Sequence, residues 1–285
     1  MIKGNKVSSL SNHRNLYNLE IICNKMSKQI ISVSDITAYL YCPRKLWLAK
    51  VKGIREPQTR EMILGRIKHK ALELFNLLEQ DFIIFISSAF AEKDILEKYK
   101  YLMRQAAIKA YEINADIAER FNINLTTFLA EFLPNTEQEI KIRISPLLES
   151  MKLYKGREIW EHLSPKYKAE FSLISENLGI KGRIDRVSFG KEILPFEIKT
   201  RSKQNIYDSD KIQLAAYALL LEDKFKKNIE KGIIELGNKQ QEILLDSNLK
   251  SQVIELAEKV RNIQGEFPSS FSKCQSCGIK EECAK

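Results

Sequence analysis

The sequence predicts an α/β protein in which a mainly helical first half precedes a sheet, and three observations support this prediction. Apolar residues recur at helical spacing from Gln58 to Leu78, and the segment 91–121 continues that pattern. After Pro165, short segments with β-type alternation are separated by glycine-containing or polar turns, so we expect three strands in an antiparallel sheet. A strong helical pattern then covers 209–225. The three strand segments are 167–175, 178–190 and 192–200.

The remaining elements are shorter or lie near the ends of the chain. Ser34 and Asp35 form a helix cap before the segment ITAYLY. The polar residues 1–30 before them are predicted to be a flexible leader, with Met26 as an alternative start. The apolar stretch FIIFI separates two helical segments. Near the C-terminus, the expected elements are strands over 231–237 and 241–246 and a helix from Asn248 to Ile263.

Composition bounds the class of protein. In 285 residues, the hydrophobic fraction of 44% and the charged fraction of 29% are those of an ordinary soluble protein. The longest apolar run, 214–221, is far shorter than the ~20 residues that span a bilayer, and no secretory signal precedes the helices, so we expect no membrane contact and a cytoplasmic location. The net charge of +9 favours DNA or RNA as a partner, although solubility or high-temperature adaptation would also explain it.

The segment GRIDRVSFGKEILPFEIKT holds the candidate chemistry. Side chains alternate along a strand, so Glu197 and Lys199 point the same way, while Asp185 lies on the neighbouring strand. Two carboxylates from adjacent strands offer oxygen ligands to Mg²⁺ or Mn²⁺, and a nearby lysine can orient or deprotonate a water and stabilise charge on a phosphate. The alternative is an ordinary exposed strand face, because such triplets are common.

The pattern Asp185-x11-Glu197-x-Lys199 resembles that of the PD-(D/E)xK nucleases, and KGRIDRV resembles their RecB-like branch. His69 in GRIKHKALE is similar to the metal-site histidine of that branch. The resemblance implies a restriction-endonuclease-like fold, with a mixed central sheet flanked by helices. It also implies that His69, Asp185 and Glu197 hold Mn²⁺ or Mg²⁺ and that Lys199 assists the attacking water, with Mn²⁺ favoured by the imidazole ligand.

Three further positions match the same branch. Gln213 and Tyr217 lie four residues apart, on one face of the predicted helix, and the resemblance implies that they contact DNA or the site. Glu170 matches an acidic position on the strand before Asp185 and is a weaker candidate for a supporting role. Without the resemblance, each would be interpreted as a packed or solvated side chain.

Cysteines are concentrated at the C-terminus. Of five in the chain, three follow the pattern Cys274-x2-Cys277-x5-Cys283, which suits a metal or cluster better than disulfides in a reducing compartment. Together with Cys42 in AYLYCPRKLWLAK, they resemble the four ligands of a [4Fe-4S] cluster in the iron-sulfur RecB-like exonucleases associated with CRISPR adaptation. Four thiolates would equally hold zinc, and Cys23 has no matching position in that family.

The resemblance extends from about Ile31 to Cys283, so we expect one RecB-like nuclease domain over 31–285 after the leader. Its expected parts are N-terminal helices with the first cluster ligand (31–80), a helical insertion (81–164), a catalytic sheet and helix (165–246), and a C-terminal helix with the iron-sulfur segment (247–285). The insertion exceeds the compact family pattern and is interpreted as a DNA-facing cap, an oligomer contact or a larger helical lobe.

The function implied by the resemblance is a DNA exonuclease, acting mainly on single strands in the 5′ to 3′ direction. It would prepare DNA fragments beside the CRISPR integrase complex. Two alternatives remain open: a related nuclease of DNA repair or of a mobile element, and a non-catalytic DNA-binding scaffold stabilised by a metal.

Overall fold

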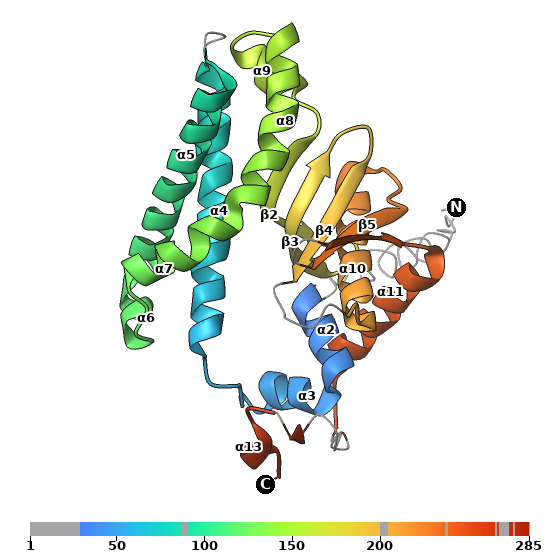
Figure 1. Cartoon of the computed structure of the whole chain (residues 1–285). Coiled ribbons are helices and arrows are strands. Elements are labelled where there is room, and N and C mark those ends of the chain that lie inside the picture. Colours follow the sequence, from blue (N-terminus) through green and yellow to red (C-terminus); the bar gives the residue numbers. More distant parts are fainter. Residues whose placement is uncertain are drawn as a thin grey trace, which may run out of the picture.

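The computed structural model describes residues 29–86, 90–199, 205–236, 239–265, 267, 274–275 and 277–284. All but the last two residues of the predicted leader, and Cys23 with them, lie outside the described residues. Figure 1 shows a sheet with helices packed against it and, beside it, a group of helices built around the long helix α4 (Arg60–Phe85). No helix within the described ranges is long and apolar enough to cross a membrane.

The sheet is mixed, which confirms the predicted fold class. Its strands are β1 (Ile31–Ser32), β2 (Lys166–Ser175), β3 (Ile180–Phe189), β4 (Ile193–Lys199), β5 (Lys231–Leu236) and β6 (Lys239–Leu244). The three strands after Pro165 pair antiparallel in sequence order, as expected. The sheet as a whole is not antiparallel, however, because β1 runs parallel to β3 and β5 runs parallel to β4. A parallel pair requires a crossover, which the helix between β4 and β5 provides.

That crossover helix, α10 (Asp208–Phe225), covers one face of the sheet and packs against β2, β3, β4 and β5. Two glycines allow this close approach. A Cβ on Gly182 would lie 2.9 Å from Leu220 Cδ1, and one on Gly232 would lie 2.9 Å from Leu214 Cγ. The core between helix and sheet also includes side chains from α2 (Val33–Tyr41) and α11 (Ser247–Arg261). We call β1–β6 with α2, α10 and α11 the sheet body.

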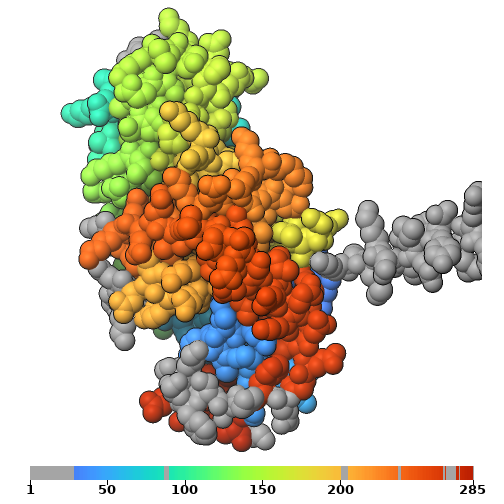
Figure 2. All heavy atoms as spheres, turned by 90° about the vertical axis from the view of Figure 1, so that its right-hand side faces the viewer, coloured from blue at the N-terminus to red at the C-terminus, as the bar shows by residue number. Residues whose placement is uncertain are grey.

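The helical lobe comprises the elements from α4 to α9 and has a separate hydrophobic core. Its other members are α5 (Glu92–Ile113), α6 (Ala115–Arg120), α7 (Leu125–Phe132), η1 (Leu133–Thr136), α8 (Glu137–Leu153) and α9 (Arg157–His162). The stretch FIIFI, expected to separate two helices, instead forms the last turn of α4 up to Phe85. The helical period continues through it because Ile83 is fully buried in the lobe core. Figure 2 shows the lobe extending beyond the sheet body, with α2 and α3 beside α11 at the opposite end.

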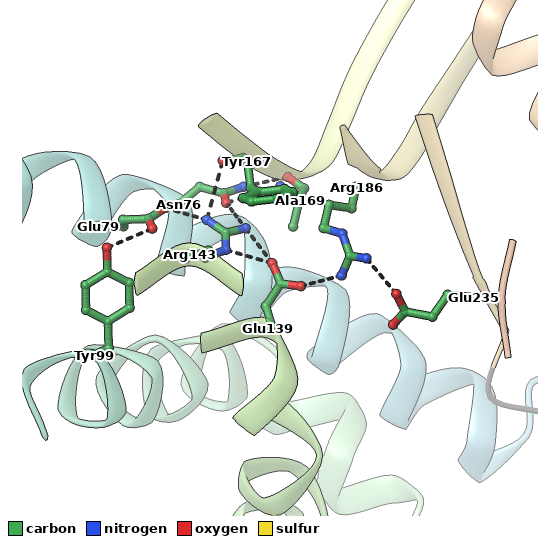
Figure 3. Close-up of polar contacts among 9 residues, drawn as sticks. All are labelled: Asn76, Glu79, Tyr99, Glu139, Arg143, Tyr167, Ala169, Arg186 and Glu235. Atoms are coloured by element: carbon green, nitrogen blue, oxygen red, sulfur yellow. Dashed lines mark hydrogen bonds and ion pairs between the residues drawn. The ribbon is translucent and has the colours of Figure 1, made fainter. Parts of the chain in front are cut away.

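A buried network of charged side chains joins the lobe to the sheet body (Figure 3). Arg143 of α8 contacts Glu79 of α4 and Glu139 of α8, and Tyr99 of α5 donates a hydrogen bond to Glu79. Glu139 also accepts from Arg186 of β3, whose guanidinium reaches Glu235 of β5 at 2.6 Å. Because these groups are buried, each charge needs a partner at close range. The network therefore fixes α4 and α8 against β3 and β5.

Candidate metal-dependent active site

The candidate site lies at a gap in the sheet beside β3. One edge of β3 pairs with β1 only at Ile180 and Lys181, and with β4 only from Arg186 to Phe189. Asp185 lies just before the point where β4 joins, and its Oδ2 accepts a hydrogen bond from the backbone N–H of Ile198 at 2.7 Å. The carboxylate therefore bridges two strands that diverge, which leaves room for other side chains beside it.

Glu197 and Lys199 lie on β4 across this gap. Their side chains lie on the same face of the strand, as the alternation along β4 predicts, and Lys199 Nζ lies 2.5 Å from Glu197 Oε1. Lys199 Nζ is also 3.5 Å from Asp210 and donates to Gln213 Oε1 at 3.1 Å. The lysine is thus held by groups from β4 and α10, with 21% of its side chain exposed. It is oriented, yet still accessible from solvent.

His69 and Glu170 join the site from the other side. His69 comes from α4 in the helical lobe, and its Nδ1 lies 2.6 Å from Oε1 of Glu170 on β2. Potential ligand atoms of His69, Glu170 and Asp185 all lie within 4.8 Å of one another, which is compact enough for one metal ion. The predicted ligand set contained Glu197 in place of Glu170. Glu197 shares the same cleft but stands outside this compact group, so its ligand role stays a prediction.

Among the described residues, two buried carboxylate oxygens lack hydrogen-bond partners: Oε2 of Glu170 and Oε2 of Glu197. Arg183 Nε lies 2.9 Å from Glu170 Oε2, close enough for an ion pair but without hydrogen-bond geometry. Buried oxygens of this kind are normally satisfied. Carboxylates with one imidazole are a donor set that Mn²⁺ accepts well and Mg²⁺ accepts when water completes the shell. The residues present therefore fit a divalent cation.

The charges of the site raise several pKa values. Burial raises the pKa of Asp185 to about 6, and the charge of Glu170 adds to the effect. Burial and the charge of Asp185 likewise raise the pKa of Glu197, with Lys199 as a partial offset. The hydrogen bond to Glu170, against the effect of burial, raises the pKa of His69. The carboxylates thus lack enough positive charge nearby, which a divalent ion would supply.

Gln213 and Tyr217 stand next to Lys199 on α10. Gln213 Nε2 donates to the Tyr217 hydroxyl at 2.8 Å while its Oε1 accepts from Lys199, so the amide orients both groups. Burial, and then the charge of Glu197, raises the pKa of Tyr217 well above its ordinary value, so the hydroxyl stays protonated and available as a donor. Their i, i+4 spacing places both on the site face of the helix.

A cleft of about 610 Å³ is lined by His69, Asp185, Glu197, Gln213 and Tyr217. Its walls include Ser32 and Ser34 at the start of α2, and Ser172 of β2. Two exposed basic residues, Lys181 and Arg183, lie on the same face of β3 as Asp185 because they are four and two positions before it, respectively. A cleft with carboxylates at one point and basic side chains next to them suits a polyanion whose backbone reaches the acidic centre.

Sequence reasoning missed three of these neighbours. The strand alternation that places Asp185 also predicts that Arg183 lies on the same face. In the same way, the position of Asp210 three residues before Gln213 predicts that it lies on the site face of α10. Asn76, which contacts the backbone next to Glu170, lies seven residues after His69 and so on the same face of α4. Its polar type on a helix gave no sign of a partner on a distant strand.

The four described cysteines lie away from this cleft, where α3 (Pro43–Val51) meets the C-terminal residues. Cys42 caps α3, its Sγ accepting from the backbone N–H of Lys45 at 3.4 Å. Arg44 donates to Cys283 Sγ at 3.1 Å and to the carbonyl of Cys283 at 2.8 Å. Lys45 pairs with Glu56 at 2.6 Å, and Glu56 accepts from the backbone N–H of Gly278. Arg44 and Lys45 are thus engaged within the protein.

Cys277 and Cys283 pack against a small cluster formed by Trp47 and Leu48 of α3 with Ile279, so the two ends of the described chain are held together. Even so, no three of the four described thiols approach within 4.8 Å of one another. A four-thiolate cage stays a prediction.

A mixed sheet that holds two carboxylates and a lysine beside a histidine and a further glutamate defines a metal-dependent phosphodiesterase type of site. The comparison with known families agrees. The PD-(D/E)XK nuclease superfamily matches residues 30–284, and the chain belongs to this superfamily of nucleases.

Among curated proteins, the chain is similar to a CRISPR-associated exonuclease Cas4/endonuclease Cas1 fusion of Leptospira interrogans serogroup Icterohaemorrhagiae serovar Lai (strain 56601). The alignment is 26% identical over 157 positions and covers 48% of this chain and 29% of the relative. The chain thus spans less than a third of that relative's length. A solved structure described as the crystal structure of SSO0001 shares 21% identity over 55% of this chain and 78% of its own, with a TM-score of 0.31.

Proposed function

We propose that this nuclease is a metal-dependent DNA exonuclease that hydrolyses single strands, in the 5′ to 3′ direction, with Mn²⁺ or Mg²⁺ in the cleft. The observation that carries the proposal is the meeting of His69, Glu170 and Asp185 within ligand distance beside Glu197 and Lys199. The basic residues Lys181 and Arg183 in the same cleft support a nucleic-acid substrate.

In the proposed mechanism, His69, Asp185 and Glu170 or Glu197 would hold the cation, which would supply Lewis acidity at the phosphate. Lys199 Nζ, held by Glu197 and Gln213, donates a hydrogen bond that orients the attacking water and stabilises the charge that develops on the phosphate oxygens. The Tyr217 hydroxyl and the Gln213 amide keep the lysine directed into the cleft. Arg183 contacts a neighbouring phosphate and sets the position of the strand.

End-labelled DNA tests this proposal. Purified protein with Mn²⁺ should shorten linear single strands from the 5′ end and leave circular single strands intact, and EDTA should stop the reaction. Cleavage of circles would correct the exonuclease assignment to an endonuclease. DNA binding without cleavage in any divalent metal would favour the non-catalytic scaffold.

We further propose that the chain acts inside the cell in CRISPR adaptation and processes fragments before the integrase complex inserts them. The similarity to the fusion of Cas4 with Cas1 supports this role, while a nuclease of DNA repair or of a mobile element would have the same chemistry. Co-purification of this chain with the integrase encoded beside it, and altered lengths of inserted fragments in its absence, test the pathway. Unaltered insertion would favour the repair alternative.

We also propose that residues 31–285 form one RecB-like nuclease domain. Within it, the helical insertion 81–164 would serve as a DNA-facing cap, an oligomer contact or a larger helical lobe.

We propose that Cys42, Cys274, Cys277 and Cys283 hold a [4Fe-4S] cluster, with zinc as the alternative. The contact of Arg44 with Cys283 supports it, because it brings the first and last of these residues into one region. Oxygen-free purification should give a brown protein with iron and sulfide; a colourless protein with one zinc would decide for zinc.

A further inference from the structure

Glu170 has an unusual backbone conformation for a strand residue. Its φ is +54°, in the left-handed region that favours glycine, although it carries a buried side chain. The ladder between β2 and β3 skips this residue: Ala169 pairs with Arg186 and Phe171 pairs with Ile184. The Glu170 carboxylate faces His69, whose Nδ1 lies 2.6 Å from its Oε1, and lies within 4.8 Å of a potential ligand atom of Asp185. Something around it must hold the conformation, because strained residues persist only where their surroundings fix them.

Asn76 of α4 supplies such a restraint. Its Nδ2 donates to the carbonyl of Ala169 at 2.5 Å, and its Oδ1 accepts from the N–H of Ala169 at 3.2 Å (Figure 3). One side-chain amide thus engages both backbone groups of the residue before Glu170, as a neighbouring strand would. Within the described sheet, β2 pairs only with β3, so α4 takes the place of a strand at this edge.

The amide itself is held in one orientation. Arg143 Nη2 donates to Asn76 Oδ1 at 3.0 Å, and Arg143 is fixed by the carboxylates of Glu79 and Glu139. The same helix contacts β2 again two turns earlier, where His69 meets Glu170. The buried network of Figure 3 therefore ends on the backbone next to a candidate metal ligand.

We propose that Asn76 is a positioning residue for the metal site: by holding the backbone of Ala169, it keeps Glu170 in its positive-φ conformation with the carboxylate beside His69. This inference rests on the proposed metal site. It gives α4 two roles in the site: His69 is a candidate ligand, and Asn76 restrains a second candidate ligand, Glu170.

The test measures Mn²⁺ binding to the full chain by the electron paramagnetic resonance signal of free Mn²⁺. Asn76→Ala should weaken Mn²⁺ binding about tenfold or more. Asn76→Asp keeps the size of the side chain and a partner for Arg143 but loses the donor to Ala169, and should weaken binding by a smaller factor. Cleavage by both variants should recover toward the wild-type rate at saturating Mn²⁺, which a general loss of folding would not allow.

The matched control is Tyr99→Phe. It removes a hydrogen bond to Glu79 at 3.0 Å from the same network without touching β2, so it should lower stability and leave Mn²⁺ affinity unchanged. Wild-type affinity in a folded Asn76→Asp protein would overturn the inference, and an equal loss in Tyr99→Phe would reduce it to general stability. By contrast, a wild-type protein with no Mn²⁺ site, or one unaffected by His69→Ala and Asp185→Ala, would overturn the proposed function itself.

Discussion

The buried network and the candidate site use the same residue types and differ in how their charges are balanced. In the network, burial would raise the pKa of Glu139, yet Arg143 and Arg186 outweigh it and hold that pKa below its usual range. In the site, burial raises the pKa of Asp185, and the positive groups nearby do not reverse the shift. Glu79 is intermediate, since its pKa is raised by burial despite Arg143. The structural network largely balances its own charges, whereas the site would take its missing positive charge from the proposed cation.

The largest effect on activity is expected when a negative charge is removed from the site. Asp185→Asn should lower the Mn²⁺-dependent cleavage rate by about 10³-fold or more, because one ligand and one negative charge are lost together. Melting temperature without metal should stay the same or rise, since an under-compensated carboxylate has been removed. Cleavage of labelled single strands provides the measurement, with Glu242→Gln on exposed β6 as the control. A fully active Asp185→Asn protein would contradict the assignment.

The opposite outcome is expected in the network. Arg143→Met should reduce the free energy of unfolding by about 3–5 kcal/mol, because Glu79 and Glu139 would be left buried without their partner. Urea unfolding followed by circular dichroism measures this loss. The double variant Arg143→Met with Glu79→Leu should recover part of it, and no recovery would show that the ion pair is not the origin of the loss.

The two regions should also respond differently to pH. A carboxylate whose folded pKa is raised stabilises the protein below its unfolded pKa, near 4, and this contribution is lost as the pH rises through the folded value, about 6 for Asp185. Glu197 acts in the same direction at higher pH, and so does His69, whose pKa is also raised. The metal-free protein should therefore lose stability, on the order of several kcal/mol, between pH 4 and pH 8 through these groups.

Added Mn²⁺ should restore stability increasingly as the pH rises, because protons and metal compete for the same oxygens. Thermal unfolding from pH 5 to pH 8.5, with and without Mn²⁺, measures both effects. Asp185→Asn should flatten the metal-free profile, whereas Glu242→Gln on exposed β6 should leave the profile unchanged.

The smallest effect is expected from the group that holds Lys199. Gln213→Ala removes a hydrogen bond to a charged amine, worth about 1.5 kcal/mol, so the cleavage rate should fall roughly tenfold at saturating Mn²⁺. The Michaelis constant for DNA should change little if the amide acts through the lysine. A large rise in that constant with an unchanged maximal rate would instead make Gln213 a direct DNA contact.

The sequence predicts the parts of the site that follow from local periodicity. Strand alternation places Glu197 beside Lys199, and helical spacing places Gln213 beside Tyr217. The positive φ of Glu170 and the hydrogen bonds from Asn76 to Ala169 could not be predicted from the sequence. Both depend on the contact between α4 and β2, which joins residues 93 positions apart in the chain. The parallel pairing of β1 with β3 and of β5 with β4 also depends on distant contacts. In addition, β1 has only two residues and so carries no periodic signal.

Because His69 belongs to α4 while the acidic groups come from the strands, the catalytic sheet is not a separable unit. Excision of residues 60–163 to make a minimal enzyme would remove an imidazole, the restraint on Glu170 and Glu139, one of the two carboxylate partners of Arg186, in one step. Engineering of this scaffold must therefore preserve the contact between the helical lobe and the sheet body and vary the outer helices instead.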